Sequence, residues 1–471
     1  MNHKEVHMKD KKVQMSNEEM MQRSGMGKLF AKMCIPSIVI MLVIVVYNMA
    51  DIFFIGKTKS MSQVAAVSLA GPVFSVFQGI GTLLGGGGSI AVSIALGKKA
   101  EERVGKITSF CCYSTLLLGA AAAVIVNLLV NPIAALLGAK GSVLTYAALY
   151  IRILALGAPF ILFANVFANI VRADGSAKES MIANGIGTVI NVILDPILIL
   201  GLHMGVAGAA VATVVGNMSS CGFLLWHMLK KQKKFSLNVK NFTVKVGIFI
   251  EVISLGIPLA VSTVLMSFSG MFANKLLIGY GDIVIAANGV ASKTGMLLSM
   301  IAMGICMGVQ PAVSYCYGAG NLDRMKKILK TAAILTVSVG TVLTLICFGF
   351  RNQIITLFID DAALIEYGRR MIVGCLVTGP IYGLYQLSTS FLQATGKVSY
   401  ATFVSVLRQG LVYLPVIFLM NYLFGLNGMI FAAATADIIS TVIAVLLGLR
   451  WFGEINRKSA SHFVGLPTYT S

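Results

Sequence analysis

The segment IPSIVIMLVIVVYNMADIFFIG, residues 35–56, is an apolar run interrupted by one proline, Pro36, and one acidic residue, Asp51. A helix of about 20 apolar residues spans the hydrocarbon core of a bilayer, which is about 30 Å thick. The segment therefore predicts a membrane-spanning helix. A second proline, Pro258, stands in a comparable apolar run in the other half of the chain.

This spacing recurs along the whole chain. Six landmarks pair at a nearly constant separation: Pro36 with Pro258, Gly97 with Gly318, Pro159 with Pro380, Gly175 with Gly396, Gly205 with Gly425 and Gly208 with Gly428. Each half holds six apolar segments, and an even number of crossings returns the chain to the same side. The halves are therefore predicted to be parallel copies, related by an axis along the membrane normal, as in many transporters.

Composition supports an all-α integral membrane protein. Of the 471 residues, 57% are hydrophobic and 12% are charged, against about 25% charged in soluble domains. Twelve transmembrane helices are predicted, at 29–55, 64–96, 107–130, 142–171, 179–201, 206–229, 247–279, 284–317, 328–350, 363–393, 399–424 and 427–450. They form two pseudo-symmetric six-helix lobes. The predicted organisation is a cytoplasmic tail at 1–28, an N-lobe at 29–229, a basic linker at 230–246, a C-lobe at 247–450 and a second cytoplasmic tail at 451–471.

The net charge of +19 is distributed by topology. With the N-terminus inside, the inner segments carry 27 Lys and Arg and the outer loops carry 6. This asymmetry follows the positive-inside rule and predicts a multi-pass cell-membrane protein with both termini in the cytoplasm. The basic linker is expected to lie against anionic headgroups, so lipids rather than nucleic acid are the expected partners. No segment is large enough for a soluble ATPase, and the eight cysteines lack metal-ligand spacing, so we expect no cofactor and no enzyme.

Ionisable residues inside the spans are the candidates for function, because charge within a membrane is costly and usually marks an ion or substrate pathway. Asp51 and Asp195 both fall in the outer half of predicted spans. A cluster of oxygen and amide groups at similar depth suits a proton or a small hard cation. Its predicted members are Tyr47, Asp51, Tyr150, Asn165, Asn191, Asp195 and Thr213.

Structural roles remain open for several of these residues. Asp51 could lie at the outer interface close to Lys57, and Asp195 could satisfy backbone groups freed by Pro196. Asp437 and Lys293 could serve either a hydrogen bond or transport, whereas Arg152 and Arg408 are expected to snorkel to the interface. Adaptable apolar side chains could line a permissive drug pocket. With Lys293 and Asp437, the candidate substrate-binding residues are Met266, Phe268, Met300, Met303 and Met307, together with Met271.

Four motifs resemble the multidrug and toxic compound extrusion (MATE) antiporters over residues 25–455. They are the first-span pattern Pro36…YNMADIFFIG, residues 47–56; RADG, residues 172–175; NVILDP, residues 191–196; and GVAGAA, residues 205–210, with Thr213 following. The DinF-like branch, and within it the MepA-type exporters of Gram-positive bacteria, looks most similar.

The resemblance implies twelve helices in two lobes that form a V, and exchange of lipophilic or cationic drugs for H⁺ or Na⁺ by alternating access in a monomer. It also implies ion coupling at the seven N-lobe residues named above, with Asp51, Asn191, Asp195 and Thr213 as metal ligands if Na⁺ is the ion. The acidic residues that the sodium-coupled branch carries in its seventh and tenth helices are replaced here by VLMSF, residues 264–268, and TGPIY, residues 378–382. The alternative is a lipid-linked oligosaccharide flippase of the same superfamily, for which Arg152, Lys293 and Arg408 would supply a cationic cavity.

Overall fold

The computed structural model describes residues 17–58, 60–231, 235, 236, 238, 246–356 and 362–464. For residues 48–52, 231, 267, 282, 286, 362–364 and 458–464 only the backbone is described. The described part of the chain is helical and contains no strand. Because every backbone polar group must be satisfied within lipid, helices are the expected solution for these apolar segments.

The first half begins with a short helix, α1 (Asn17–Arg23), inside the segment expected to be a tail. The remaining helices of this half are α2 (Met26–Gly56), α3 (Met61–Gly97), α4 (Glu101–Leu128), α5 (Val130–Leu136), α6 (Gly141–Leu156), α7 (Ala158–Ala173), α8 (Ala177–Asp195), the π-helical turn η2 (Pro196–Gly201) and α9 (Val206–Lys231).

The second half repeats this order. Its helices are α10 (Val246–Ile278), α11 (Asp282–Gly318), α12 (Leu322–Gly349), α13 (Arg351–Thr356), α14 (Ala362–Leu376), α15 (Gly379–Ala394), α16 (Val398–Val406), the π-helical turn η4 (Leu407–Val412) and α17 (Tyr413–Val464).

The described residues contain nine helical segments long and apolar enough to cross a membrane, and two bent helix pairs bring the number to 11. One of the nine, Val398–Arg457, is 60 residues long, far more than one crossing needs. It turns back at Gly425, where φ is 56° and the backbone is not helical. This segment therefore accounts for two of the twelve predicted spans.

Both halves break the same span. The α6–α7 pair bends by 56° and the α14–α15 pair by 41°. Pro159 and Pro380 lie in the first turn of the helix after each break, where a proline is tolerated because that N–H has no intrahelical partner. The two spans that looked continuous in the sequence are thus kinked at equivalent places.

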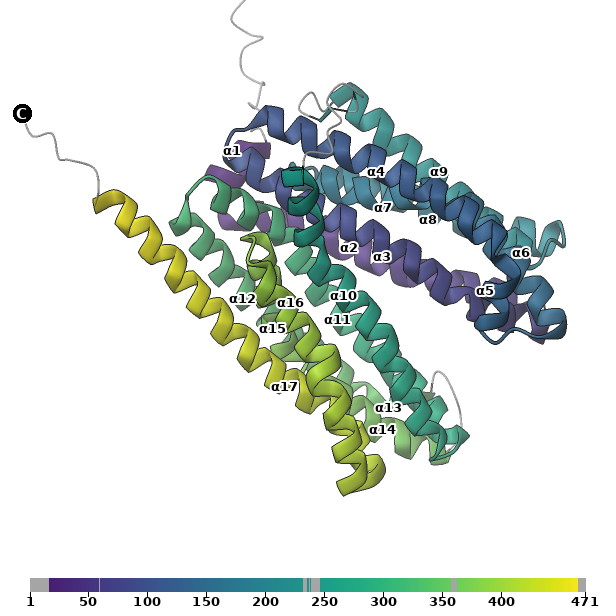
Figure 1. Ribbon diagram of the computed structural model, residues 1–471. Helices are drawn as coiled ribbons and strands as arrows, with labels where there is room; N and C mark the ends of the chain where they lie inside the picture. Colours follow the sequence, from purple (N-terminus) through teal and green to yellow (C-terminus); the bar gives the residue numbers. More distant parts are fainter. Residues whose placement is uncertain are drawn as a thin grey trace, which may run out of the picture.

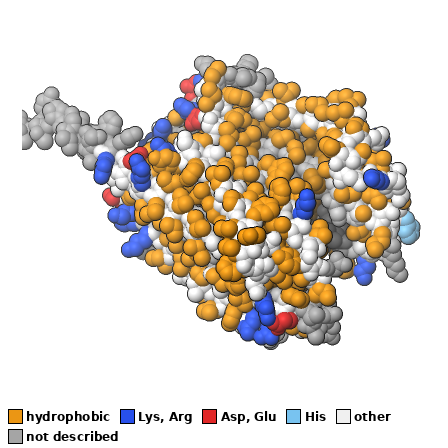
Figure 2. All heavy atoms as spheres, turned by 60° about the horizontal axis from the view of Figure 1, so that its bottom comes forward, with side chains coloured by type: hydrophobic (Ala, Val, Ile, Leu, Met, Phe, Trp, Pro, Cys, Tyr) orange, Lys and Arg blue, Asp and Glu red, His pale blue; other side chains and the backbone are white. Residues whose placement is uncertain are grey.

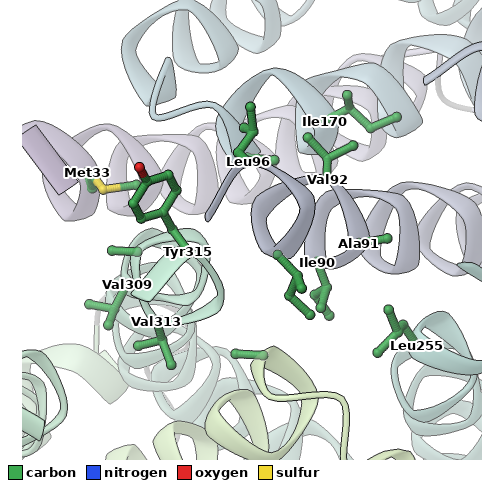
Figure 3. Packing of buried hydrophobic residues seen from close by; sticks show 14 of the residues in the cluster. Met33, Ile90, Ala91, Val92, Leu96, Ile170, Leu255, Val309, Val313 and Tyr315 are labelled. Atoms are coloured by element: carbon green, nitrogen blue, oxygen red, sulfur yellow. The ribbon is translucent and has the colours of Figure 1, made fainter. Parts of the chain in front are cut away.

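The lobes form a V (Figure 1). Helices α2–α9 and α10–α17 meet near α1 and diverge toward α5 and α6 in one lobe and toward α13 and α14 in the other. Buried apolar residues form three clusters: one draws on both halves, the second lies within residues 55–210 and the third within residues 277–432. Figure 3 shows part of the shared cluster, where Met33 and Ile90 from the first half lie near Val309 and Tyr315 from the second. The lobes therefore share a core only at the closed end.

Glycines allow the lobes to approach closely at that end. A Cβ on Gly97 would lie 2.2 Å from the Tyr315 carbonyl oxygen, and one on Gly318 would lie 2.3 Å from that of Ile94. Within the run of residues 85–88, a Cβ on Gly87 would lie 2.0 Å from the Val252 carbonyl oxygen. This glycine run therefore lets α3 pack closely against α10.

The outer surface is apolar along the helices. Figure 2 shows hydrophobic side chains over most of one face, with Lys and Arg mainly at its margins. Large side chains such as Leu117, Leu345 and Leu446 are more than half exposed. Water would penalise such a surface, whereas lipid would not.

Candidate ion-coupling site

Two helices of the N-lobe are joined by a hydroxyl pair. The Tyr47 hydroxyl, on α2, donates to the Thr213 hydroxyl, on α9, at 3.2 Å. Thr213 is buried, and Asn217 donates to its carbonyl oxygen at 2.8 Å. The predicted proximity of Tyr47 and Thr213 is therefore present in the structure.

Helix α8 presents an amide and a carboxylate to the same lobe interior. Asn191 and Asp195 are one turn apart on one face, and their exposed fractions are 1% and 0%. A Cβ on Gly216 of α9 would lie 3.2 Å from the Asn191 Cβ. Because α8 and α9 run in opposite directions, Asp195 lies about one turn further on, at the level of Thr213. Within the described residues the Asn191 amide has no hydrogen-bond partner, which is rare for a buried polar group.

Asp51 lies on α2 one turn after Tyr47, and its side chain is outside the part of the chain that the structure describes. Helical spacing places Asp51 on the same face as Tyr47, whose hydroxyl contacts Thr213. Tyr150, on α6, is buried in the N-lobe core cluster.

Asn165 belongs to a polar row that the sequence did not reveal. Its amide donates to Gln78 of α3, and Asn169, one turn along α7, donates to the Asn165 carbonyl oxygen at 2.8 Å. Arg172, buried one turn further on, donates to Asn169. Gln78 and Asn169 were missed because uncharged amides within apolar segments give no charge signal, and Gln78 lies on another helix.

The C-lobe contains an ion pair that contradicts one expectation. Arg408 Nε lies 2.7 Å from Asp437 Oδ1, and the two side chains are 19% and 12% exposed. Arg408 does not snorkel, because its guanidinium lies inside the lobe over the rings of Tyr382 and Tyr385. Asp437 therefore has a cationic partner inside the lobe.

The apolar residues predicted to line a drug pocket lie on α10 and α11, where Ser269 donates to the carbonyl oxygen of Gln409, next to Arg408. Met266, Phe268 and Met271 of α10 are exposed, and so is Lys293 of α11. Met300, Met303 and Met307 are half-buried along α11. Helices α10 and α11 both contact α3 of the other lobe, so these residues lie on the helices that border the V.

Comparisons with known proteins agree with this architecture. The MatE family model matches residues 36–197 and again 258–419. The chain is 32% identical to "Multidrug export protein MepA" of Staphylococcus saprophyticus over 426 residues, which covers 90% of this chain and 94% of that protein. The protein of the same name from Staphylococcus aureus (strain MRSA252) is also 32% identical, over 427 residues.

Solved structures show the same fold at lower identity. An outward-facing multidrug resistance MATE family transporter of the MOP superfamily superposes with a TM-score of 0.88 at 22% identity, over 93% of this chain and 98% of that one. A MOP superfamily transporter from Pyrococcus furiosus superposes with a TM-score of 0.86 at 22% identity over the same shares.

Proposed function

Because the chain belongs to the MatE family, we propose that it is a secondary active antiporter that exports lipophilic, cationic drugs in exchange for H⁺ or Na⁺ by alternating access. The family resemblance and the helical two-lobe fold predicted from the sequence are confirmed. Relatives that align with 90% of this chain are multidrug export proteins. This similarity disfavours the oligosaccharide flippase. The chain is a multi-pass membrane protein.

The burial of the Asp195 carboxylate beside Asn191 and Thr213 carries the coupling part of this proposal. A carboxylate kept inside a membrane lobe is costly and is retained where its charge is used. Carboxylate, amide and hydroxyl oxygens accept a proton or bind a hard cation such as Na⁺. The site also lies in the lobe's own interior, between α2, α8 and α9, and not in the core shared by the lobes.

Exchange follows from charge. With Asp51 and Asp195 ionised, the N-lobe attracts a lipophilic cation while the carrier is open to the cytoplasm. Uptake of H⁺ or Na⁺ at the same carboxylates, while the carrier is open to the outside, cancels that attraction and releases the drug. Return of the ion-loaded carrier requires the lobes to separate at the glycine contacts of the closed end. The drug and the ion use the same carboxylates, so the carrier does not transport both in the same direction.

The test replaces each carboxylate by its neutral near-isostere. Asp195→Asn and Asp51→Asn should abolish ethidium efflux from cells while expression stays normal, since removing a membrane charge does not oppose insertion. Asp323→Asn is the matched control, because Asp323 is exposed in the first turn of α12. Wild-type efflux in both N-lobe variants would refute the coupling site. Vesicles given a pH gradient or a Na⁺ gradient then identify the ion.

A further inference from the structure

The C-lobe ion pair is part of a complete cation-binding arrangement. Arg408 Nε holds one carboxylate oxygen of Asp437 at 2.7 Å, and the Thr378 hydroxyl donates to the other at 3.2 Å. The guanidinium carbon lies 4.9 Å from the Tyr382 ring centroid and 5.2 Å from that of Tyr385. A carboxylate and two aromatic faces around one positive charge are the groups that bind organic cations. Here the positive charge belongs to the protein itself.

The fold does not require this pair. The shift that pairs Pro159 with Pro380 maps Arg408 and Thr378 onto Gly187 and Gly157 of the N-lobe, and the shift that pairs Gly208 with Gly428 maps Asp437 onto Asn217. The N-lobe helices cross closely there, since a Cβ on Gly187 would lie 2.9 Å from the Gly216 carbonyl oxygen. One copy of the fold thus packs with no charge at the two positions where the other places two opposite charges.

The polar residues of the N-lobe site likewise have apolar counterparts in the C-lobe. The N-lobe residues Asn191 and Asp195 map by the first shift onto Val412 and Val416 of the C-lobe, and Thr213 maps by the second shift onto Ala433. The buried carboxylate described in each lobe, Asp195 or Asp437, therefore lies at a different place in the repeat. A buried ion pair is commonly less stable than apolar packing of the same volume, so packing alone gives no reason to keep the charges in the C-lobe.

The backbone around the pair can rearrange. Arg408 lies in the π-helical turn η4, and Thr378 lies in the break between α14 and α15. π-helical turns and helix breaks are common at functional sites, because they leave the helix less tightly hydrogen-bonded. The side chains of Arg408 and Asp437 also keep 19% and 12% of their surface exposed, which leaves the pair open to a competing ligand.

We propose that Asp437, Thr378, Tyr382 and Tyr385 form a second binding site for the cationic group of the exported drug, in which Arg408 occupies the site until a planar aromatic cation displaces it. The inference rests on the proposed function, because it assumes a lipophilic cation as substrate. It assigns to the C-lobe a site in which the protein's own guanidinium competes with the substrate, so Arg408 limits affinity and sets selectivity.

The test measures the dissociation constant of ethidium, a planar aromatic monocation, for the purified full-length protein by fluorescence anisotropy. Arg408→Gln removes the competitor and leaves the carboxylate and rings available, so ethidium should bind at least tenfold more tightly. Asp437→Asn leaves Arg408 as an unbalanced positive charge, so ethidium should bind at least tenfold more weakly. The double variant should lie between the two.

The opposite signs separate a binding role from a structural one. A merely structural pair predicts that both single variants lose affinity together, and that outcome, or an unchanged affinity in Arg408→Gln, overturns the proposal. If either single variant fails to fold, Arg408→Lys decides, because it keeps the ion pair but stacks less well on the two rings, and tighter ethidium binding is expected. If the wild type exports no ethidium from cells, the proposed function fails; if it exports ethidium and the variants show no opposite shifts, only the C-lobe site fails.

Discussion

Gly187 determines how closely α8 approaches α9 beside the N-lobe polar site. A Cβ at this position would lie 2.2 Å from Ser220 Oγ and 2.9 Å from the Gly216 carbonyl oxygen. Asn191 is one turn away on α8, and its Cβ would be 3.2 Å from a Cβ on Gly216. The glycine pair therefore sets the distance across which Asn191 and Asp195 face Thr213.

Gly187→Ala should push α8 from α9, because one clashing atom is backbone and cannot rotate away. We expect a loss of about 1–3 kcal/mol in stability, typical of overpacking, together with weaker ethidium efflux. Thermal unfolding of the purified protein measures the first effect. Gly185→Ala is the matched control on the same helix, since a Cβ there would meet nothing within 4 Å. Equal unfolding temperatures for the two variants would show that the crossing is not tight.

Part of the candidate site could be predicted from the charges and the residue spacing in the sequence. Asn191 and Asp195 stood out because a carboxylate inside an apolar segment is conspicuous and the amide one turn earlier shares its face. The partner of Asn165 did not stand out, since Gln78 is an uncharged residue in another helix. Arg408 was wrongly expected to snorkel, because its distance from the membrane interface depended on where the end of the predicted span was drawn. Its partner Asp437 could not be recognised either, because it lies in the next span.

Helix α1 is the element that contacts both lobes at the closed end. Asn17 donates to the Ser176 hydroxyl between α7 and α8 at 3.0 Å, and Gln22 donates to the Tyr315 hydroxyl of α11 at 3.0 Å. Between them Met20 and Met21 are buried in the shared core cluster. The sequence NEEMMQR, residues 17–23, gave little indication of this, because seven residues with two methionines are too short for a periodic pattern.

Arg324, in the first turn of α12, holds the end of α1. Its guanidinium donates to the carbonyl oxygens of Met20 at 3.1 Å and Ser24 at 3.0 Å, and also to that of Met21. The Met20 carbonyl also accepts from the Ser24 backbone N–H at 3.3 Å, whereas the last carbonyls of a helix generally lack an intrahelical partner. Arg324→Ala should therefore release α1 and expose the bond after Arg23 to trypsin.

The rate of tryptic cleavage at Arg23 measures this release, and we expect an increase of several-fold. Lys327→Ala is the control, because Lys327 is exposed on the same helix and its loss also removes one tryptic site. Identical cleavage rates in the two variants would mean that the buried methionines alone hold α1 in place.

The two lobes of the whole molecule were predictable from the repeat and their V from the family resemblance, whereas the contacts at the closed end were not predictable. Landmarks that recur at a nearly constant separation, such as Pro36 with Pro258, imply two similar lobes, but a repeat does not say which ends of the lobes touch. Contact is decided by pairs such as Gly97 with Tyr315, in which the partner is a backbone atom of another helix. The hydrophobic periodicity of a segment does not indicate which backbone atom of another helix will pack against it.

The orientation of the V in the membrane follows from its charges. The closed end carries α1 and the described part of the linker, where the Ser109 hydroxyl donates to the Ser236 carbonyl oxygen at 2.7 Å. By the positive-inside rule we expect this basic end to face the cytoplasm, so that the V opens outward. Asn238 is exposed near the closed end, and Lys140, between α5 and α6, is exposed at the open end.

A cysteine at each position reports the side of the membrane. Asn238→Cys should react with a membrane-impermeant maleimide only after the cells are opened, whereas Lys140→Cys should react in intact cells. The native background is low, because six of the eight free cysteines are buried, and replacing the half-buried Cys347 and Cys375 by serine lowers it further. Labelling of Asn238→Cys but not Lys140→Cys in intact cells would show that the V opens toward the cytoplasm. Ethidium would then meet the N-lobe carboxylates from the cytoplasm in this conformation, which would be the drug-loading state of the cycle.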